Sequence, residues 1–354
     1  MTTAESLAAP EVVVPVALTG VGAPPTLADV ARLAGVSPAT ASRVLTGSVR
    51  VRQQTVDKVQ DAMTRLGYVR NRAPRSSTHR LAGAIALVFC EEAVKALADP
   101  FFERMVRSLS KALASADLQL ILLTLHSPRE YYTVSRYLRA GHVDGALLVS
   151  MHSRPDFDFA ALGIPLVFCG RPVKGGENLS YIDADNVDGA RNAVNYLLNS
   201  GRKAIATIAG PSDMAPGIDR LLGYRKAMIA AGINDPGMIA YGDFGLLSGE
   251  HAMYRLIDHR PSLDAVFVAS DLMAAGALRA LRRLGRRVPD DVAVIGFDDS
   301  PLSLQTKPRL STVRQPVDAM AAQMASELLS IIAGPRGEPV HLVLDTELIL
   351  RDSA

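Results

Sequence analysis

Two short helical patterns stand close together in residues 26–47, which read TLADVARLAGVSPATASRVLTG. Apolar positions of the first pattern recur at helical spacing and are Leu27, Val30, Ala31 and Ala34. Thr26 is placed to cap this helix, and Gly35 gives the permissive backbone that a tight turn between helices requires. Ser37 is a good N-cap and Pro38 a good first residue, so we expect a second helix there.

The second predicted helix has two different faces. Its inner face carries Ala41, Val44 and Leu45, and its outer face carries the small, polar or basic residues Ala39, Thr40, Ser42 and Arg43. A short helix with such an outer face fits the major groove of DNA. The alternative is an ordinary helical hairpin on a protein surface.

From Leu81 onward, short apolar runs alternate with amphipathic patterns. The predicted strands cover residues 82–89, 118–125, 145–149, 165–168, 204–209, 265–269 and 292–297, with two more around Leu342 and Leu348. The predicted helices cover residues 101–116, 129–140, 187–199, 218–230, 247–258, 272–284 and 317–332. This alternation predicts parallel sheets with helices on both faces, and the number of units predicts two similar α/β lobes. A ligand would bind between the lobes, at the carboxyl ends of the strands.

Several of these predicted strand ends are followed by polar or aromatic residues. They are Phe101 and Phe102, Arg220, Phe244, Ser270 and Asp271, and Asp298 and Asp299. Carboxylates and an arginine that hydrogen-bond hydroxyls, beside an aromatic face that stacks a ring, suit a sugar or a nucleobase. Taken singly, Phe102 also fits a core position, and Asp271 or Asp299 also fits a helix cap.

The charge of the chain is concentrated at the predicted helix-turn-helix. The 354 residues carry a net charge of only +2, and their hydrophobic content of 48% allows a full core in two or three domains. Residues 26–80, however, hold ten Lys and Arg against three Asp, a net +7. Such a compact basic segment suits the neutralisation of DNA phosphates.

The chain shows no sign of export. No apolar stretch reaches the roughly 20 residues of a membrane span, and residues 1–25 have no positive charge and contain prolines, so we expect a flexible tail rather than a signal peptide. Cys90 and Cys169 lack metal-ligand spacing and read as core residues of a reducing compartment. We therefore expect a cytoplasmic, nucleoid-associated protein with no membrane association, no metal and no cofactor.

These motifs resemble the lactose/galactose repressor (LacI/GalR) family from Thr26 to near the C-terminus. The resemblance rests on the helix-turn-helix run and on VRQQTVDKVQDAMTRLGYVRNRA, DPFF, VDGALLVS, ATIAG, YGDFGLLSG, FVASDLMAAGALRAL, VPDDVAVIGFDD, LSTVRQP and LDTELILRDS. The later motifs look most like the actinobacterial repressors that respond to cellobiose and related β-glucosides.

The resemblance implies an all-α helix-turn-helix headpiece (residues 26–70), a hinge (71–80) and a two-lobed, periplasmic-binding-protein-like effector and dimerisation domain (81–354). The N-lobe would hold about 81–184 and 315–338, and the C-lobe about 185–314 and 339–354. The candidate DNA contacts are Thr26, Ser37, Pro38, Ala39, Thr40, Ser42, Arg43, Asn71, Arg72 and Arg75. The candidate effector contacts are Phe101, Arg220, Phe244, Ser270 and Asp298; Arg220 and Asp298 would pair with ligand hydroxyls, and Phe244 would stack on the ligand.

Two departures from the family pattern stand out. The hinge reads NRAPRSST, so Pro74 replaces an alanine and Ser77 stands where a leucine usually wedges into the minor groove. We expect this hinge to kink DNA less, or to begin its helix at Pro74. In FCGRP, Gly170 stands where many members carry an aspartate that bonds the ligand.

The implied mechanism is a ligand-gated repressor. A homodimer without an appended tetramer-forming helix places two headpieces on operator DNA, and the sugar effector closes the lobes and separates the hinges. A sugar-binding transport protein would instead have a secretory signal and no headpiece. An α/β enzyme would need a glycine-rich nucleotide loop or a catalytic cluster, and the sequence shows neither.

Overall fold

The computed structural model describes residues 26–45, 51–66, 81–153, 159, 162–233, 235, 238–334 and 337–354. The chain divides into two compact units, Met1–Ser76 and Ser77–Ala354. The predicted tail (1–25) and hinge (71–80) lie outside the described residues. No helix of the described residues is long and apolar enough to cross a membrane.

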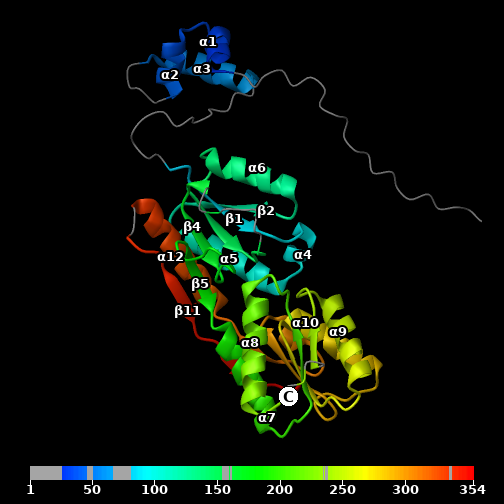
Figure 1. Cartoon of the computed structure of the whole chain (residues 1–354). Helices are drawn as coiled ribbons and strands as arrows, with labels where there is room; N and C mark the ends of the chain where they lie inside the picture. Colours follow the sequence, from blue (N-terminus) through cyan, green and yellow to red (C-terminus); the bar gives the residue numbers. More distant parts are fainter. Residues whose placement is uncertain are drawn as a thin grey trace, which may run out of the picture. The chain divides into compact units, whose positions relative to one another are not determined.

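The first unit, the headpiece, has three helices in its described residues. They are α1 (Leu27–Ala34), α2 (Pro38–Leu45) and α3 (Gln53–Leu66) (Figure 1). Their buried side chains form one small core of Val30, Ala31, Ala41, Val59 and Ala62. The first two helices match the predicted helix-turn-helix, and α3 completes the core beneath them.

The second unit, the body, begins with the N-lobe. Its six-stranded parallel sheet has the order β11-β5-β4-β3-β1-β2. The strands are β1 (Ala84–Phe89), β2 (Gln119–Thr124), β3 (Gly145–Val149), β4 (Leu166–Cys169), β5 (Ser180–Ala184) and β11 (His341–Leu344). The helices are α4 (Ala93–Leu97), α5 (Pro100–Ala114), α6 (Pro128–Arg139) and α12 (Val317–Ala333). One face of the sheet packs against α5 and α12, and the other packs against α6.

The C-lobe repeats this plan with a second six-stranded sheet, in the order β12-β10-β9-β8-β6-β7. Its strands are β6 (Ile205–Ala209), β7 (Ile239–Tyr241), β8 (Ala265–Val268), β9 (Ala293–Asp298), β10 (Ser311–Arg314) and β12 (Glu347–Ile349), of which only β12 is antiparallel to its neighbour. Helices α7 (Asn186–Asn199) and α8 (Ala215–Ala230) cover one face, and α9 (Leu246–His259) and α10 (Asp271–Arg283) the other. A short helix, α11 (Leu302–Gln305), follows β9.

The predicted fold class, a helix-turn-helix headpiece and a two-lobed α/β body, is confirmed. One predicted boundary is wrong: residues 339–354 do not all belong to the C-lobe. Strand β11 pairs in parallel with β5 of the N-lobe, with Leu342 opposite Ile182. The side chains of Leu342 and Leu344 pack on the N-lobe core, and this burial keeps β11 there. The chain therefore returns to the C-lobe between Leu344 and Glu347.

Helices α9 and α10 pack closely because each has a glycine at the contact. A Cβ at Gly276 of α10 would collide with the carbonyl oxygen of Leu246, and a Cβ at Gly249 of α9 would collide with the backbone of Met273. Backbone cannot yield as a flexible side chain can, so an added methyl group must push the two helices apart.

Replacing Gly276 by alanine should lower the free energy of unfolding of the body by about 1–3 kcal/mol, the usual cost of overpacking. Urea denaturation followed by circular dichroism measures this change. Gly334→Ala is the control, since a Cβ at Gly334 meets nothing within 4 Å. Equal stability of the two variants would show that α9 and α10 separate without cost.

Candidate functional site

The turn of the headpiece is built by local capping. Thr26 and Asp29 form a reciprocal capping box at the start of α1: the Thr26 side chain accepts from the Asp29 N–H, and the Thr26 N–H donates to Asp29 Oδ2 at 2.9 Å. Gly35 ends α1 with a left-handed φ of +66°. The side chain of Ser37 then accepts from the backbone N–H of Thr40 at 3.1 Å, which caps α2.

The start of α2 presents its predicted DNA-facing residues to solvent to different degrees. Ser37, Pro38, Ala39 and Arg43 are exposed, whereas Thr40 and Ser42 are half-buried. Between them, Ala41 is fully buried in the headpiece core. The remaining candidates, Asn71, Arg72 and Arg75, lie outside the described residues, as do Pro74 and Ser77 of the hinge.

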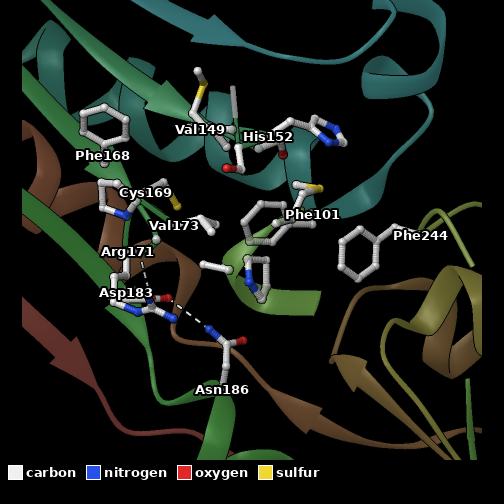
Figure 2. Close-up of a pocket in the computed structure, with 18 of the residues that line it drawn as sticks. Phe101, Val149, His152, Phe168, Cys169, Arg171, Val173, Asp183, Asn186 and Phe244 are labelled. Atoms are coloured by element: carbon white, nitrogen blue, oxygen red, sulfur yellow. Dashed lines mark hydrogen bonds between the residues drawn. The ribbon is translucent and has the colours of Figure 1, made fainter. Parts of the chain in front are cut away.

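A cavity of about 200 Å³ lies between the two lobes of the body. All five predicted effector residues line it, namely Phe101, Arg220, Phe244, Ser270 and Asp298. Figure 2 shows two of them, Phe101 and Phe244, beside each other in the cavity. The five come from different strand ends: Phe101 lies at the start of α5, Ser270 caps α10 after β8, and Asp298 ends β9. Parallel strands bring their carboxyl ends to one edge of each sheet, which is why residues far apart in sequence meet there.

Arg220 is the buried cation of this cavity and is only 4% exposed. Its Nε donates to Asn186 Oδ1 at 2.8 Å, and its Nη1 donates to the carbonyl oxygen of Ala269 at 2.6 Å. Nη1 also lies 3.5 Å from Asp298 Oδ1, and the guanidinium carbon lies 3.8 Å from the centre of the Phe297 ring. Burial lowers the pKa of Arg220, and the carboxylates around it oppose that shift. These contacts hold the guanidinium in one orientation.

Asp298 is a half-buried carboxyl group, with its side chain 12% exposed, and it has unusual properties. Gln315 Nε2 donates to its Oδ1 at 2.7 Å, and the N–H of Asp271 lies 3.4 Å from its Oδ2. Burial raises the pKa of Asp298 to about 7, although Arg220 acts in the opposite direction. Its φ of +122° is strained for a residue other than glycine. Phe244, which lies 5.8 Å from the Arg220 guanidinium, is also left-handed at φ +66°.

The neighbouring acidic residues have structural roles. Asp271 accepts from the Thr312 hydroxyl at 2.5 Å and from the Ser300 N–H at 2.8 Å. Asp299 forms ion pairs with Arg351 at 2.5 Å and with Arg314 at 2.7 Å. Of these acidic residues, Asp298 lines the cavity, as the sequence predicts.

Comparisons with known proteins agree with both units. Residues 26–71 match the model of bacterial regulatory proteins of the lacI family, and residues 194–354 match a periplasmic binding protein-like domain. The transcriptional regulator CelR of Thermobifida fusca is 45% identical over 93% of this chain and 98% of its own length. The chain belongs to the LacI family of bacterial regulatory proteins.

Solved structures support the same assignment for this LacI-family chain. A transcriptional regulator CelR–cellobiose complex superimposes with a TM-score of 0.74 at 44% identity, covering 93% of this chain and all of that chain. A lac repressor dimer bound to operator and the anti-inducer ONPF superimposes with a TM-score of 0.69 at 26% identity, covering 94% and 99%. The protein is therefore a DNA-binding transcriptional regulator.

The cavity of this LacI-family regulator also contains polar residues that the sequence analysis missed. Asp183 and Asn186 lie at the end of β5, and Gln315 follows β10. Neither strand was predicted, so the sequence did not mark these positions as ends of strands, where a ligand would bind. The DADN stretch at 183–186, three carboxylate or amide side chains in four residues, was the signal that could have found two of them.

Among the described residues, three ion pairs join the lobes around the cavity, and in each the cation belongs to the N-lobe and the carboxylate to the C-lobe. Arg171 lies 2.9 Å from Asp219, and Lys95 lies 3.5 Å from Asp243. His152 Nδ1 lies 2.9 Å from Asp213 Oδ2, while its Nε2 lies 3.5 Å from Glu91 Oε1 within its own lobe. Attraction across the cavity therefore favours the arrangement of the lobes in which these pairs form.

The His152 contact should make the stability of the body depend on pH. Its hydrogen bonds to Glu91 and Asp213 raise the pKa of His152, although burial opposes them. The stabilisation is therefore fully present below the ordinary histidine pKa of about 6.5 and is lost as the pH rises through the raised value. His152→Gln should lower the melting temperature more at low pH than at high pH, by at most about 2–4 °C.

Differential scanning fluorimetry across this pH range measures the effect. His142, which stacks on Tyr137 at an exposed position, supplies the control variant His142→Gln. A melting-temperature difference between wild type and His152→Gln that does not change with pH would contradict the assignment of a charged contact.

Proposed function

We propose that this protein is a transcriptional repressor whose operator affinity is controlled by a sugar bound between the lobes of the body. The observation that carries the proposal is the cavity, which is lined by Arg220, Asp298, Phe101 and Phe244. The same chain also contains a helix-turn-helix. A charged donor beside a carboxylate suits a polyhydroxyl ligand, and an aromatic face suits a sugar ring. The protein would act in the cytoplasm, at the nucleoid.

Cellobiose is the first effector to test, because a CelR–cellobiose complex resembles this chain over 93% of its length. In the proposed complex, Arg220 and Asp298 bond the ligand hydroxyls, Phe244 stacks on a ring, and Phe101 and Ser270 complete the wall. Among the described residues, Arg220 Nη2 has no protein partner. It can therefore donate to the ligand without breaking an existing bond.

On the DNA side, we propose that Thr40, Ser42 and Arg43 make the polar contacts in the major groove. Beside them would lie Ser37, Pro38 and Ala39. Thr26, at the start of α1, would face the sugar-phosphate backbone of the DNA. Asn71, Arg72 and Arg75 would add contacts near the hinge. A homodimer would set two such headpieces in successive major grooves, as expected for a pseudo-palindromic operator.

Arg43→Ala should bind a promoter fragment about tenfold or more weakly than wild type does. This is the usual loss for a contact to a base, roughly 1–3 kcal/mol. Gel shift or fluorescence anisotropy at several salt concentrations measures the loss. Arg65→Ala is the matched control, since Arg65 is an exposed headpiece arginine that lies 3.6 Å from Asp61. If both variants lose equal affinity, net charge rather than an Arg43 contact explains DNA binding.

Cellobiose should raise the melting temperature of the full chain, because a ligand that binds only the folded state stabilises it by about 2.7 kcal/mol at 100 times its Kd. Coupling to DNA is reciprocal and typically about 1–3 kcal/mol. Operator should therefore change the cellobiose affinity by the same factor by which cellobiose changes the operator affinity. A panel of mono- and disaccharides that gives no thermal shift would overturn sugar control.

A further inference from the structure

A second carboxylate lies at the N-lobe side of the cavity, and the proposed sugar contacts do not use it. Asp183 belongs to β5, lines the cavity and is 6% exposed. Figure 2 shows it beside Arg171 and Asn186. Burial raises the pKa of Asp183, as expected for a carboxyl group that has lost most of its water. Such a group needs hydrogen-bond partners for both of its oxygens.

The protein supplies only part of those partners. Asp183 Oδ1 accepts from the N–H of Ala184 at 2.8 Å and from Asn186 Nδ2 at 3.0 Å. Oδ2 accepts from the N–H of Arg171 at 2.9 Å. A carboxylate oxygen can accept about two hydrogen bonds, so among the described residues Oδ2 keeps one open acceptor position. Because Asp183 lines the cavity, a ligand in the cavity can supply the missing donor.

Asp183 is also the N-lobe end of a chain of hydrogen bonds that crosses into the C-lobe. Asn186 donates to Asp183 and accepts from Arg220, and Arg220 lies against Asp298. Arg220 is thus linked to a carboxylate of each lobe, directly to Asp298 and through Asn186 to Asp183. A ligand with hydroxyl groups along its length can donate to both acceptors at once, which would tie the lobes together.

We propose that Asp183 is a specificity-determining residue of the effector site, accepting a hydroxyl group of the ligand from the N-lobe side through the open position on Oδ2. This inference rests on the proposed function and narrows its ligand class. The effector is an uncharged polyhydroxyl ligand long enough to reach acceptors in both lobes, as a disaccharide is. An anionic sugar is disfavoured at this end, because its charge would face Asp183.

The test compares wild type with Asp183→Asn by isothermal titration calorimetry. The probe is cellobiose, or the sugar of the panel that binds wild type most tightly, together with its monodeoxy analogues. Asp183→Asn should lose about tenfold or more in affinity for the parent sugar, as is usual when a charged acceptor is removed. One monodeoxy analogue, which lacks the hydroxyl that Asp183 accepts, should bind both proteins equally.

A purely structural role for Asp183 gives a different result. Asp183→Asn would then weaken the parent sugar and every analogue by the same factor, with a lower melting temperature of the free protein. That uniform loss would overturn the inference.

The outcomes separate this inference from the proposed function. If wild type binds no sugar of the panel, sugar control is wrong and the role of Asp183 falls with it. If wild type binds a sugar and Asp183→Asn keeps its affinity and its discrimination among analogues, the proposed function stands and this inference alone is overturned.

Discussion

The burial of one guanidinium group organises the body of this protein. Arg220 is removed from water, so its charge is costly unless neighbouring groups compensate for it. Asn186, the carbonyl oxygen of Ala269 and Asp298 do so, and the ring of Phe297 lies against the guanidinium face. These groups come from the start of α7, the end of β8 and the end of β9, so satisfying Arg220 fixes three elements relative to α8.

The same contacts connect lobe geometry to the cavity. Asn186 and Gln315 stand where the chain passes between the lobes, after β5 and after β10, and both hydrogen-bond the Arg220–Asp298 pair. A rotation of one lobe against the other must therefore move partners of that pair. A ligand bonded to Arg220 or Asp298 changes the balance of the same hydrogen bonds. Under the proposed function, these contiguous contacts are the route by which ligand binding would shift the position of the lobes.

The sequence predicts the parts of this fold that rest on apolar burial. The runs that became β1, β3, β6, β8 and β9 are continuous and apolar, and they were found with boundaries close to the observed ones. Strands β5 and β10 were missed because polar residues, Ser180 and Asp183 in β5 and Ser311 and Thr312 in β10, occupy buried positions beside the apolar ones. Ser180 donates to Glu327, and Thr312 donates to Asp271; both partners are distant in sequence and invisible to periodicity. The candidate site was therefore predicted on its C-lobe side and at Phe101 of the N-lobe, whereas Asp183, Asn186 and Gln315 were missed.

Backbone strain completes the picture of the cavity. Among the described residues, five that are not glycine have positive φ, and Ser150, Phe244 and Asp298 of these line the cavity. A left-handed residue at a strand end turns the chain sharply, so its side chain leaves the strand's alternation and can point into the space between the lobes. Each such residue costs about 1–3 kcal/mol and persists only where the surroundings hold it. The cores on both faces of each sheet provide that hold. At the cavity, the packing of the two lobes thus holds residues other than glycine at positive φ, a backbone conformation that these residues disfavour on their own.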